Sequence, residues 1–107
     1  MKIINLGRGQ GKTTRLLYAS EFNDAPILCA TDAHKKCLIE KAKGYGLEIP
    51  EPITVNDIVS GKVRGSKITD KDVLVDEAPF VLQYLLRGLG MNGEVKAITL
   101  SEKYNLE

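Results

Sequence analysis

The chain has 107 residues, a length that predicts one domain over residues 1–107 with a single hydrophobic core. Hydrophobic residues make up 43% of it, charged residues make up 27%, and the formal net charge is +1, which argues against a disordered, fibrous or strongly basic protein. No run approaches the roughly 20 apolar residues that a membrane-spanning helix needs, so we expect a cytoplasmic protein with no membrane partner.

The first half of the chain predicts short strands that alternate with longer helices. In chain order these are a strand over residues 3–6, a helix over 12–22, a strand over 27–30, a helix over 33–43 and an extended piece over 53–55. Thr31 and Asp32 can cap the second helix, because their side-chain oxygens accept hydrogen bonds from its free N–H groups. Gly44 and Gly46 end the same helix, since glycine readily adopts the left-handed backbone that follows many helices.

The second half continues this alternation after a polar, basic stretch. Residues 61–70 predict an exposed loop, residues 73–75 a buried strand, residues 79–89 a helix and residues 95–100 the last strand. Pro79 fits the first turn of its helix, where the missing N–H would have no helical partner in any case. Asp76 and Glu77 come directly after the buried strand.

This order of elements predicts an α/β fold, a three-layer sandwich with a small parallel sheet of about four strands. Right-handed crossovers then place helices on both faces of the sheet. Ligands of such sheets bind beyond the carboxyl ends of the strands. A glycine-rich loop over residues 7–11 and the acidic pair Asp76 and Glu77 both follow strands, so we expect them to meet at this edge.

The segment between the first strand and the first helix has the composition of a phosphate-binding loop. It reads Leu-Gly-Arg-Gly-Gln-Gly-Lys-Thr-Thr over residues 6–14. Glycines let successive N–H groups turn inward around an anion, and the helix start adds free donors and the positive end of its dipole. The candidate nucleotide-binding residues are Gly7, Arg8, Gly9, Gln10, Gly11, Lys12, Thr13 and Thr14.

Three of these residues have separate predicted roles. Lys12 reaches the β- and γ-phosphates, the Thr13 hydroxyl binds Mg²⁺, and Thr14 contacts the α-phosphate. The spacing departs by one position from the usual Gly-x-x-x-x-Gly-Lys-Ser/Thr pattern. Leu6 stands where the first glycine is expected, and Gly7 follows it.

The acidic pair supplies the other half of the predicted chemistry. Phosphoryl transfer needs a metal ion and a positioned water, because most of its catalysis is stabilisation of charge. We expect Asp76 to hold Mg²⁺ through a water, and Glu77 to orient or deprotonate the attacking water. The alternative interpretation is two solvated acids at a strand end.

Residues 7–13 resemble the Walker A loop of phage terminase large subunits and superfamily 1 helicases, and residues 76–78 resemble their Walker B element with its catalytic glutamate. Residues 29–36 resemble the helicase segment called motif Ia, and residues 54–58 more loosely resemble a following motif. The resemblance implies a P-loop NTPase that uses ATP and Mg²⁺, often with DNA, in a phage-derived context. It also implies that the last strand lies between the first strand and the Walker B strand, with the second strand beyond.

The same resemblance implies further roles. Terminases place an arginine in the phosphate loop, which makes Arg8 a candidate arginine finger in cis; a solvent-exposed loop arginine is the alternative. Thr99 and Ser101 stand where these families carry a residue that senses the γ-phosphate. These motors also carry an adenine-recognising segment and a second, DNA-gripping lobe, which this sequence does not match. Three alternatives follow: a protein partner completes the site, a neighbouring copy completes it, or the chain binds nucleotide without much turnover.

The sequence thus favours an enzyme, a nucleic-acid-associated ATPase in which Lys12, Glu77 and Arg8 are catalytic. One alternative is a nucleotide-gated accessory module with little or no turnover. Another is a nucleoside kinase, since residues 76–80 faintly resemble the Asp-Glu-Ala-Gln-Phe run of thymidine kinases. We interpret His34 as a capping or surface residue, because a lone histidine carries no metal-binding or catalytic geometry.

Overall fold

The computed structural model of the chain describes residue 4 and residues 11–100. Several sequence predictions lie outside these residues: most of the strand over residues 3–6, the loop residues Gly7, Arg8, Gly9 and Gln10, and the sensor candidate Ser101. Each helix in the described part of the chain is too short or too polar to traverse a bilayer.

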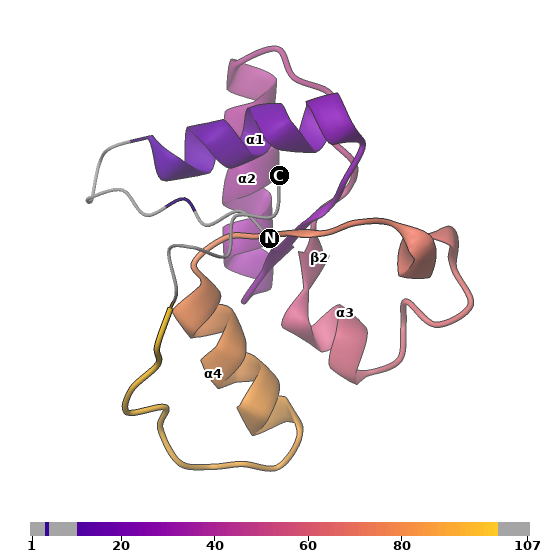
Figure 1. The fold of residues 1–107 in the computed structure, drawn as a ribbon. Helices are drawn as coiled ribbons and strands as arrows, with labels where there is room; N and C mark the ends of the chain where they lie inside the picture. Colours follow the sequence, from indigo (N-terminus) through magenta and orange to yellow (C-terminus); the bar gives the residue numbers. More distant parts are fainter. Residues whose placement is uncertain (1–3, 5–10, 101–107) are drawn as a thin grey trace.

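The described residues form a small parallel sheet flanked by α-helices (Figure 1). The strands are β1 (Ile27–Cys29), β2 (Ile53–Thr54) and β3 (Leu74–Val75), in the spatial order β2-β1-β3. The helices are α1 (Lys12–Asn23), α2 (Asp32–Gly44), α3 (Val55–Val59) and α4 (Ala78–Gly88), with a 3₁₀ turn, η1, over Lys67–Asp70. The predicted α/β class with parallel strands is confirmed, with three strands described in place of about four.

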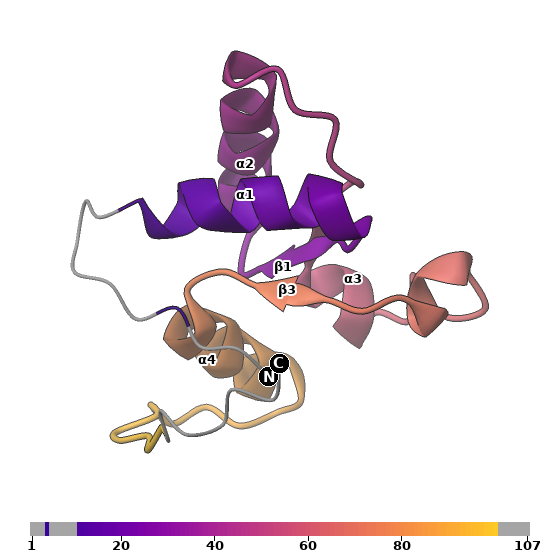
Figure 2. The ribbon, with the colours of Figure 1, turned by 45° about the horizontal axis from the view of Figure 1, so that its top comes forward.

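Alternate side chains of β1 point to opposite faces of the sheet and contribute to a separate core on each. Ile27 and Cys29 pack with residues of α1 and α2, whereas Leu28 packs with residues of α3 and α4. The buried residues of the first core are Leu17, Ile27, Cys29, Leu38 and Ala42, and those of the second are Ala30, Val55 and Val81. Figures 1 and 2 show α1 and α2 on one side of the strands and α3 and α4 on the other, which is the predicted three-layer arrangement.

The two ends of α2 lie where the sequence predicts, for local reasons. The Thr31 hydroxyl accepts the backbone N–H of His34 at 3.2 Å and caps the start of the helix. At the other end Gly46 has a φ of 71°, and the Leu47 N–H donates to the Ala42 carbonyl at 2.8 Å. This left-handed glycine with its backward hydrogen bond closes the helix and returns the chain toward the sheet.

The predicted strand over residues 95–100 is wrong, because this segment belongs to no strand. It runs back along α4 instead (Figure 2). The Gln83 side chain of α4 donates to the Gly93 carbonyl at 3.0 Å and accepts the Val95 N–H at 2.7 Å. A helix side chain thus satisfies backbone groups that a neighbouring strand would otherwise satisfy, and Thr99 lies exposed on this segment rather than at a strand end.

One strand pairing agrees with the order that the family resemblance implies. β3 pairs with β1 in parallel, so the strand before the acidic pair does neighbour the second predicted strand. No strand among the described residues lies on the other side of β3. The predicted burial of residues 73–75 is incomplete, because Val73 is 48% exposed and Val75 is 39% exposed.

Candidate functional site

Helix α1 begins without a side-chain cap. Its N-cap residue, Gly11, has a φ of 79°, a left-handed conformation that glycine adopts without steric cost. The first helical hydrogen bond runs from the Arg15 N–H to the Gly11 carbonyl at 3.1 Å. The N–H groups of Lys12, Thr13 and Thr14 therefore have no partner within the helix, and its first turn contains no acidic residue. Such a helix start attracts anions.

The end of β3 fixes Asp76 and Glu77 in different ways. The Asp76 N–H donates to the Leu28 carbonyl at 3.1 Å, which extends the pairing of β3 with β1, and the Asp76 side chain is only 4% exposed. Glu77 is the N-cap of α4 with a φ of 56°, a left-handed conformation that costs a non-glycine residue about 1–2 kcal/mol. Its side chain is 41% exposed. Asp76 is thus buried and fixed by the sheet, whereas Glu77 is strained and accessible.

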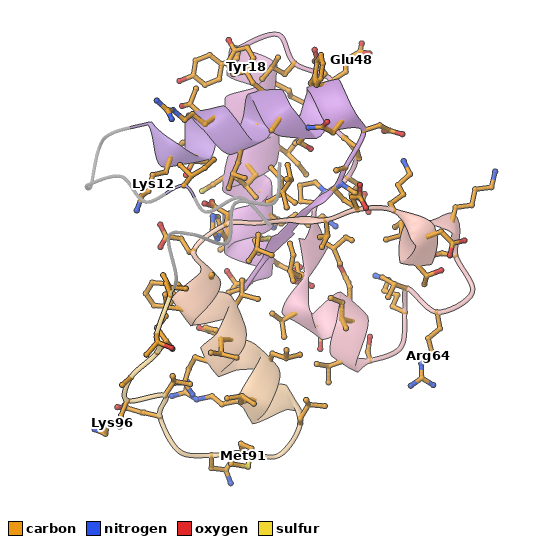
Figure 3. The ribbon with its side chains drawn as sticks, viewed as in Figure 1. Lys12, Tyr18, Glu48, Arg64, Met91 and Lys96 are labelled. Atoms are coloured by element: carbon orange, nitrogen blue, oxygen red, sulfur yellow. The ribbon has the colours of Figure 1, made fainter. Side chains whose placement is uncertain are left out.

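Folding brings the start of α1 to the end of β3. The Thr13 hydroxyl donates to Asp76 Oδ2 at 3.4 Å across 63 positions of sequence. Lys12 Nζ lies 3.9 Å from Glu77 Oε1. Figure 3 shows the Lys12 side chain extending from the start of α1 toward the side of the molecule that carries α4. Two predicted phosphate- and metal-binding residues therefore meet the two predicted acids at the carboxyl edge of the sheet.

A further side chain at this edge was missed by the sequence analysis. His34 Nε2 lies 2.9 Å from Asp76 Oδ2, and an imidazole N–H donated to the carboxylate holds Asp76 from the α2 side. The interpretation of His34 as a capping or surface residue is confirmed for its backbone N–H, which donates to the capping hydroxyl of Thr31, but its side chain is only 25% exposed. The available signal was position: α2 follows a strand, so its first turn begins at the ligand-binding edge. We call Lys12, Thr13, His34, Asp76 and Glu77 the edge cluster.

The oxygen atoms of the edge cluster suit Mg²⁺. This ion takes oxygen ligands, and in phosphate sites one or two protein oxygens commonly hold it together with phosphate oxygens and water. Thr13 Oγ1 and Asp76 Oδ2 are a hydroxyl and a carboxylate oxygen only 3.4 Å apart. In the described part of the chain no three His, Cys, Asp or Glu side chains are grouped so that they could hold a metal ion. Thr13 and Asp76 could therefore hold Mg²⁺ only if phosphate oxygens or water supplied its remaining ligands.

The described hollows of the surface lie away from the edge cluster. One, of about 350 Å³, lies between α4 and residues 95–98. Another, of about 310 Å³, lies between α3 and α4 and includes Tyr84 and Arg87. Neither is lined by a residue of the edge cluster. The residues of the predicted phosphate-binding loop that precede Gly11 lie outside the described residues.

The two cysteines also lie apart from this chemistry. Both are free thiols. Burial raises the pKa of the Cys29 thiol to about 11, because the thiolate loses its hydration inside the core. Cys29 is therefore a neutral packing residue rather than a nucleophile.

Comparison of the chain with protein-family models, with curated proteins and with solved structures gave no match. The chemistry of the edge cluster is therefore the basis for inferring a function. It consists of an ammonium, a hydroxyl, an imidazole and two carboxylates beside a helix start that has no cap of its own.

Proposed function

We propose that this chain is a P-loop protein that binds ATP with Mg²⁺ at the edge cluster and hydrolyses it to ADP and phosphate. The Thr13–Asp76 contact at 3.4 Å is the observation that supports this most. It joins the predicted metal-binding hydroxyl of α1 to the predicted metal-binding carboxylate after β3. The uncapped start of α1 and the ammonium of Lys12 supply the positive potential that a triphosphate needs at the same place.

Each residue of the edge cluster has a separate role in the proposed reaction. Lys12 contacts the β- and γ-phosphates and offsets the charge that develops on the transferred group. Thr13 and Asp76 hold Mg²⁺, which when bound neutralises phosphate charge, and His34 keeps Asp76 in position. Glu77 accepts a proton from the attacking water. The water oxygen bonds to the γ-phosphorus as the bond to the bridging β–γ oxygen breaks and ADP leaves.

We also propose that the ATPase acts in association with nucleic acid. Support comes from the segment over residues 61–70, which projects away from the sheet in Figures 1 and 2. It carries Lys62, Arg64 and Lys67, and Figure 3 shows the Arg64 side chain directed outward. Cationic side chains on a projecting segment suit contacts with phosphate backbones. Arg8 is the candidate arginine finger in cis, and a partner or neighbouring copy is the other source.

The test is release of ADP from Mg-ATP by the full chain, with and without single- and double-stranded DNA. We expect Lys12→Ala to abolish nucleotide binding, because it removes the cation that faces the phosphates. Lys36→Ala is the matched control, since it removes an exposed lysine from α2. We expect Glu77→Gln to retain ATP but to slow turnover by about 100-fold or more. Glu40→Gln, an exposed residue of α2, is its control.

Three outcomes would change the assignment. Turnover at the wild-type rate in Lys12→Ala would show that the edge cluster is not the nucleotide site. Binding of ATP that depends on Lys12, with no turnover under any condition, would instead identify a nucleotide-gated binding module. Acceleration of ADP formation by a nucleoside acceptor would point to a kinase.

A further inference from the structure

Two half-exposed tyrosines, Tyr18 in the middle of α1 and Tyr45 at the end of α2, lie together. Tyr18 is 52% exposed and Tyr45 is 51% exposed. Their ring centroids are 6.1 Å apart with planes tilted by 48°. The Tyr45 hydroxyl lies 3.4 Å from Thr14 Oγ1, so the aromatic pair reaches the first turn of the helix. None of these residues belongs to the edge cluster.

The backbone holds both rings in place. Tyr18 follows Thr14 by four positions on α1, so the two side chains lie on the same face of the helix. Tyr45 is the C-cap of α2, and its N–H donates to the Lys41 carbonyl at 3.1 Å. Gly46, with its left-handed φ of 71°, fixes the chain direction immediately afterwards. The exposed ring surface is therefore set by two helices rather than by a mobile loop.

The orientation of a bound triphosphate relates this pair to the edge cluster. Lys12 and Thr14 are two positions apart on α1 and hence about 200° apart around its axis. Figure 3 agrees, with Lys12 and Tyr18 on opposite sides of α1. A triphosphate whose γ-group lies at Lys12 and whose α-group lies at Thr14 leaves its nucleoside on the Thr14 side. That side carries the two tyrosine rings.

We propose that Tyr18 and Tyr45 form the nucleobase subsite and stack against a purine, an inference that rests on the proposed function. Stacking on an aromatic ring needs only the face of the base, and it stabilises by dispersion and exclusion of water. The Tyr45 hydroxyl, next to Thr14, lies where the ribose and α-phosphate join. The strength of stacking depends on the area of the base more than on its hydrogen-bonding groups. The subsite therefore accepts ATP and GTP alike and holds pyrimidine nucleotides more weakly.

The test distinguishes the contribution of the base to binding affinity from that of the phosphates. Affinities are measured by titration calorimetry for ATP and for inorganic tripolyphosphate, both with Mg²⁺. We expect Tyr18→Ala and Tyr45→Ala each to weaken ATP binding by about 10-fold and to leave tripolyphosphate binding unchanged. Tyr18→Phe and Tyr45→Phe keep the rings, and each should lose far less ATP affinity than the alanine variant at the same position. Tyr84→Ala, which removes a 41%-exposed tyrosine from α4, is the matched control.

Each contrary result identifies which inference fails. Unchanged ATP affinity in both alanine variants, with binding still lost in Lys12→Ala, would overturn the base subsite and leave the proposed function intact. An equal loss of ATP and tripolyphosphate binding would also overturn it, because the tyrosines would then support the phosphate site alone. A wild-type chain that binds neither ligand would overturn both inferences. Circular dichroism of every variant confirms that the compared proteins are folded.

Discussion

Asp57 and Asp76 each follow a strand at the same edge of the sheet. The carboxylate of Asp57 is bound by a residue three positions away, whereas that of Asp76 is bound by side chains of two other helices. Asp57 lies in the first turn of α3 and exchanges hydrogen bonds with Thr54. The Thr54 N–H donates to Asp57 Oδ2 at 3.0 Å, and the Asp57 N–H donates to Thr54 Oγ1 at 3.1 Å. Asp76 instead contacts the side chains of Thr13 and His34, which belong to α1 and α2.

This difference separates a carboxylate that caps its own helix from one that is held by side chains of distant elements. The bonds of Asp57 close a capping box and explain why α3 begins at its position. The side-chain contacts of Asp76 cross 63 and 42 positions and contribute nothing to starting α4. Burying a carboxylate is costly unless its partners compensate for the lost hydration. The proposed metal-binding role would account for an acid kept at this buried position.

The largest expected effect is on metal-dependent nucleotide binding. Asp76→Asn keeps the size of the side chain but removes the negative charge that would hold Mg²⁺. We expect the affinity for Mg-ATP to fall by about 100-fold. The measurement is titration of a fluorescent ATP analogue at several Mg²⁺ concentrations.

Asp57→Asn makes the same chemical change after strand β2, which lies on the other side of β1, and is the matched control. We expect it to bind Mg-ATP as the wild type does. If Asp57→Asn and Asp76→Asn reduced the affinity for Mg-ATP equally, the distinction between the two carboxylates would be contradicted. Both substitutions would then affect binding by destabilising the folded structure.

For Asp57 we expect the effect of substitution on stability rather than on nucleotide binding. Asp57→Ala leaves the Thr54 N–H without its acceptor, and Thr54 is only 2% exposed. We expect the free energy of unfolding to fall by about 1 kcal/mol, the usual loss for a helix-capping bond. Urea denaturation measures it, with Glu40→Ala on the exposed face of α2 as the control. A midpoint equal to that of the wild type would show that the capping box is not stabilising.

The smallest expected effect is the dependence of that stability on pH. The Thr54 N–H that donates to the carboxylate holds the pKa of Asp57 below its ordinary value of 3.8, and the Thr54 hydroxyl, Lys35 and Lys62 act in the same direction. A lowered pKa in the folded state stabilises the protein above pH 3.8, and this contribution is lost as pH falls through the folded pKa.

The stability difference between the wild type and Asp57→Ala should therefore be constant near neutral pH and narrow below pH 3.8. Urea midpoints measured in steps from pH 6 to pH 3 would follow it. A difference that widened on acidification would mean that Asp57 binds a proton more readily in the folded chain.

Local features of the fold were predictable because their causes lie within a few residues. The Thr31 cap and the left-handed Gly46 mark the ends of α2 in sequence and structure alike. The conformation of residues 95–100, which were predicted to form a strand and do not, was not predictable in the same way. The apolar residues of this segment suit a strand, but strand pairing depends on a distant neighbour. The side chain of Gln83 in α4 binds the backbone at the start of the segment instead.

The candidate site likewise has features with local causes and features that depend on long-range packing. The sequence by itself determined the chemistry at the start of α1 and after β3, since Lys12, Thr13, Asp76 and Glu77 are adjacent in pairs. Only the tertiary structure decided that His34 contacts Asp76 and that Tyr45 reaches Thr14. Those contacts depend on which helix packs on which face of the sheet, and burial of the two cores across many residues determines that packing.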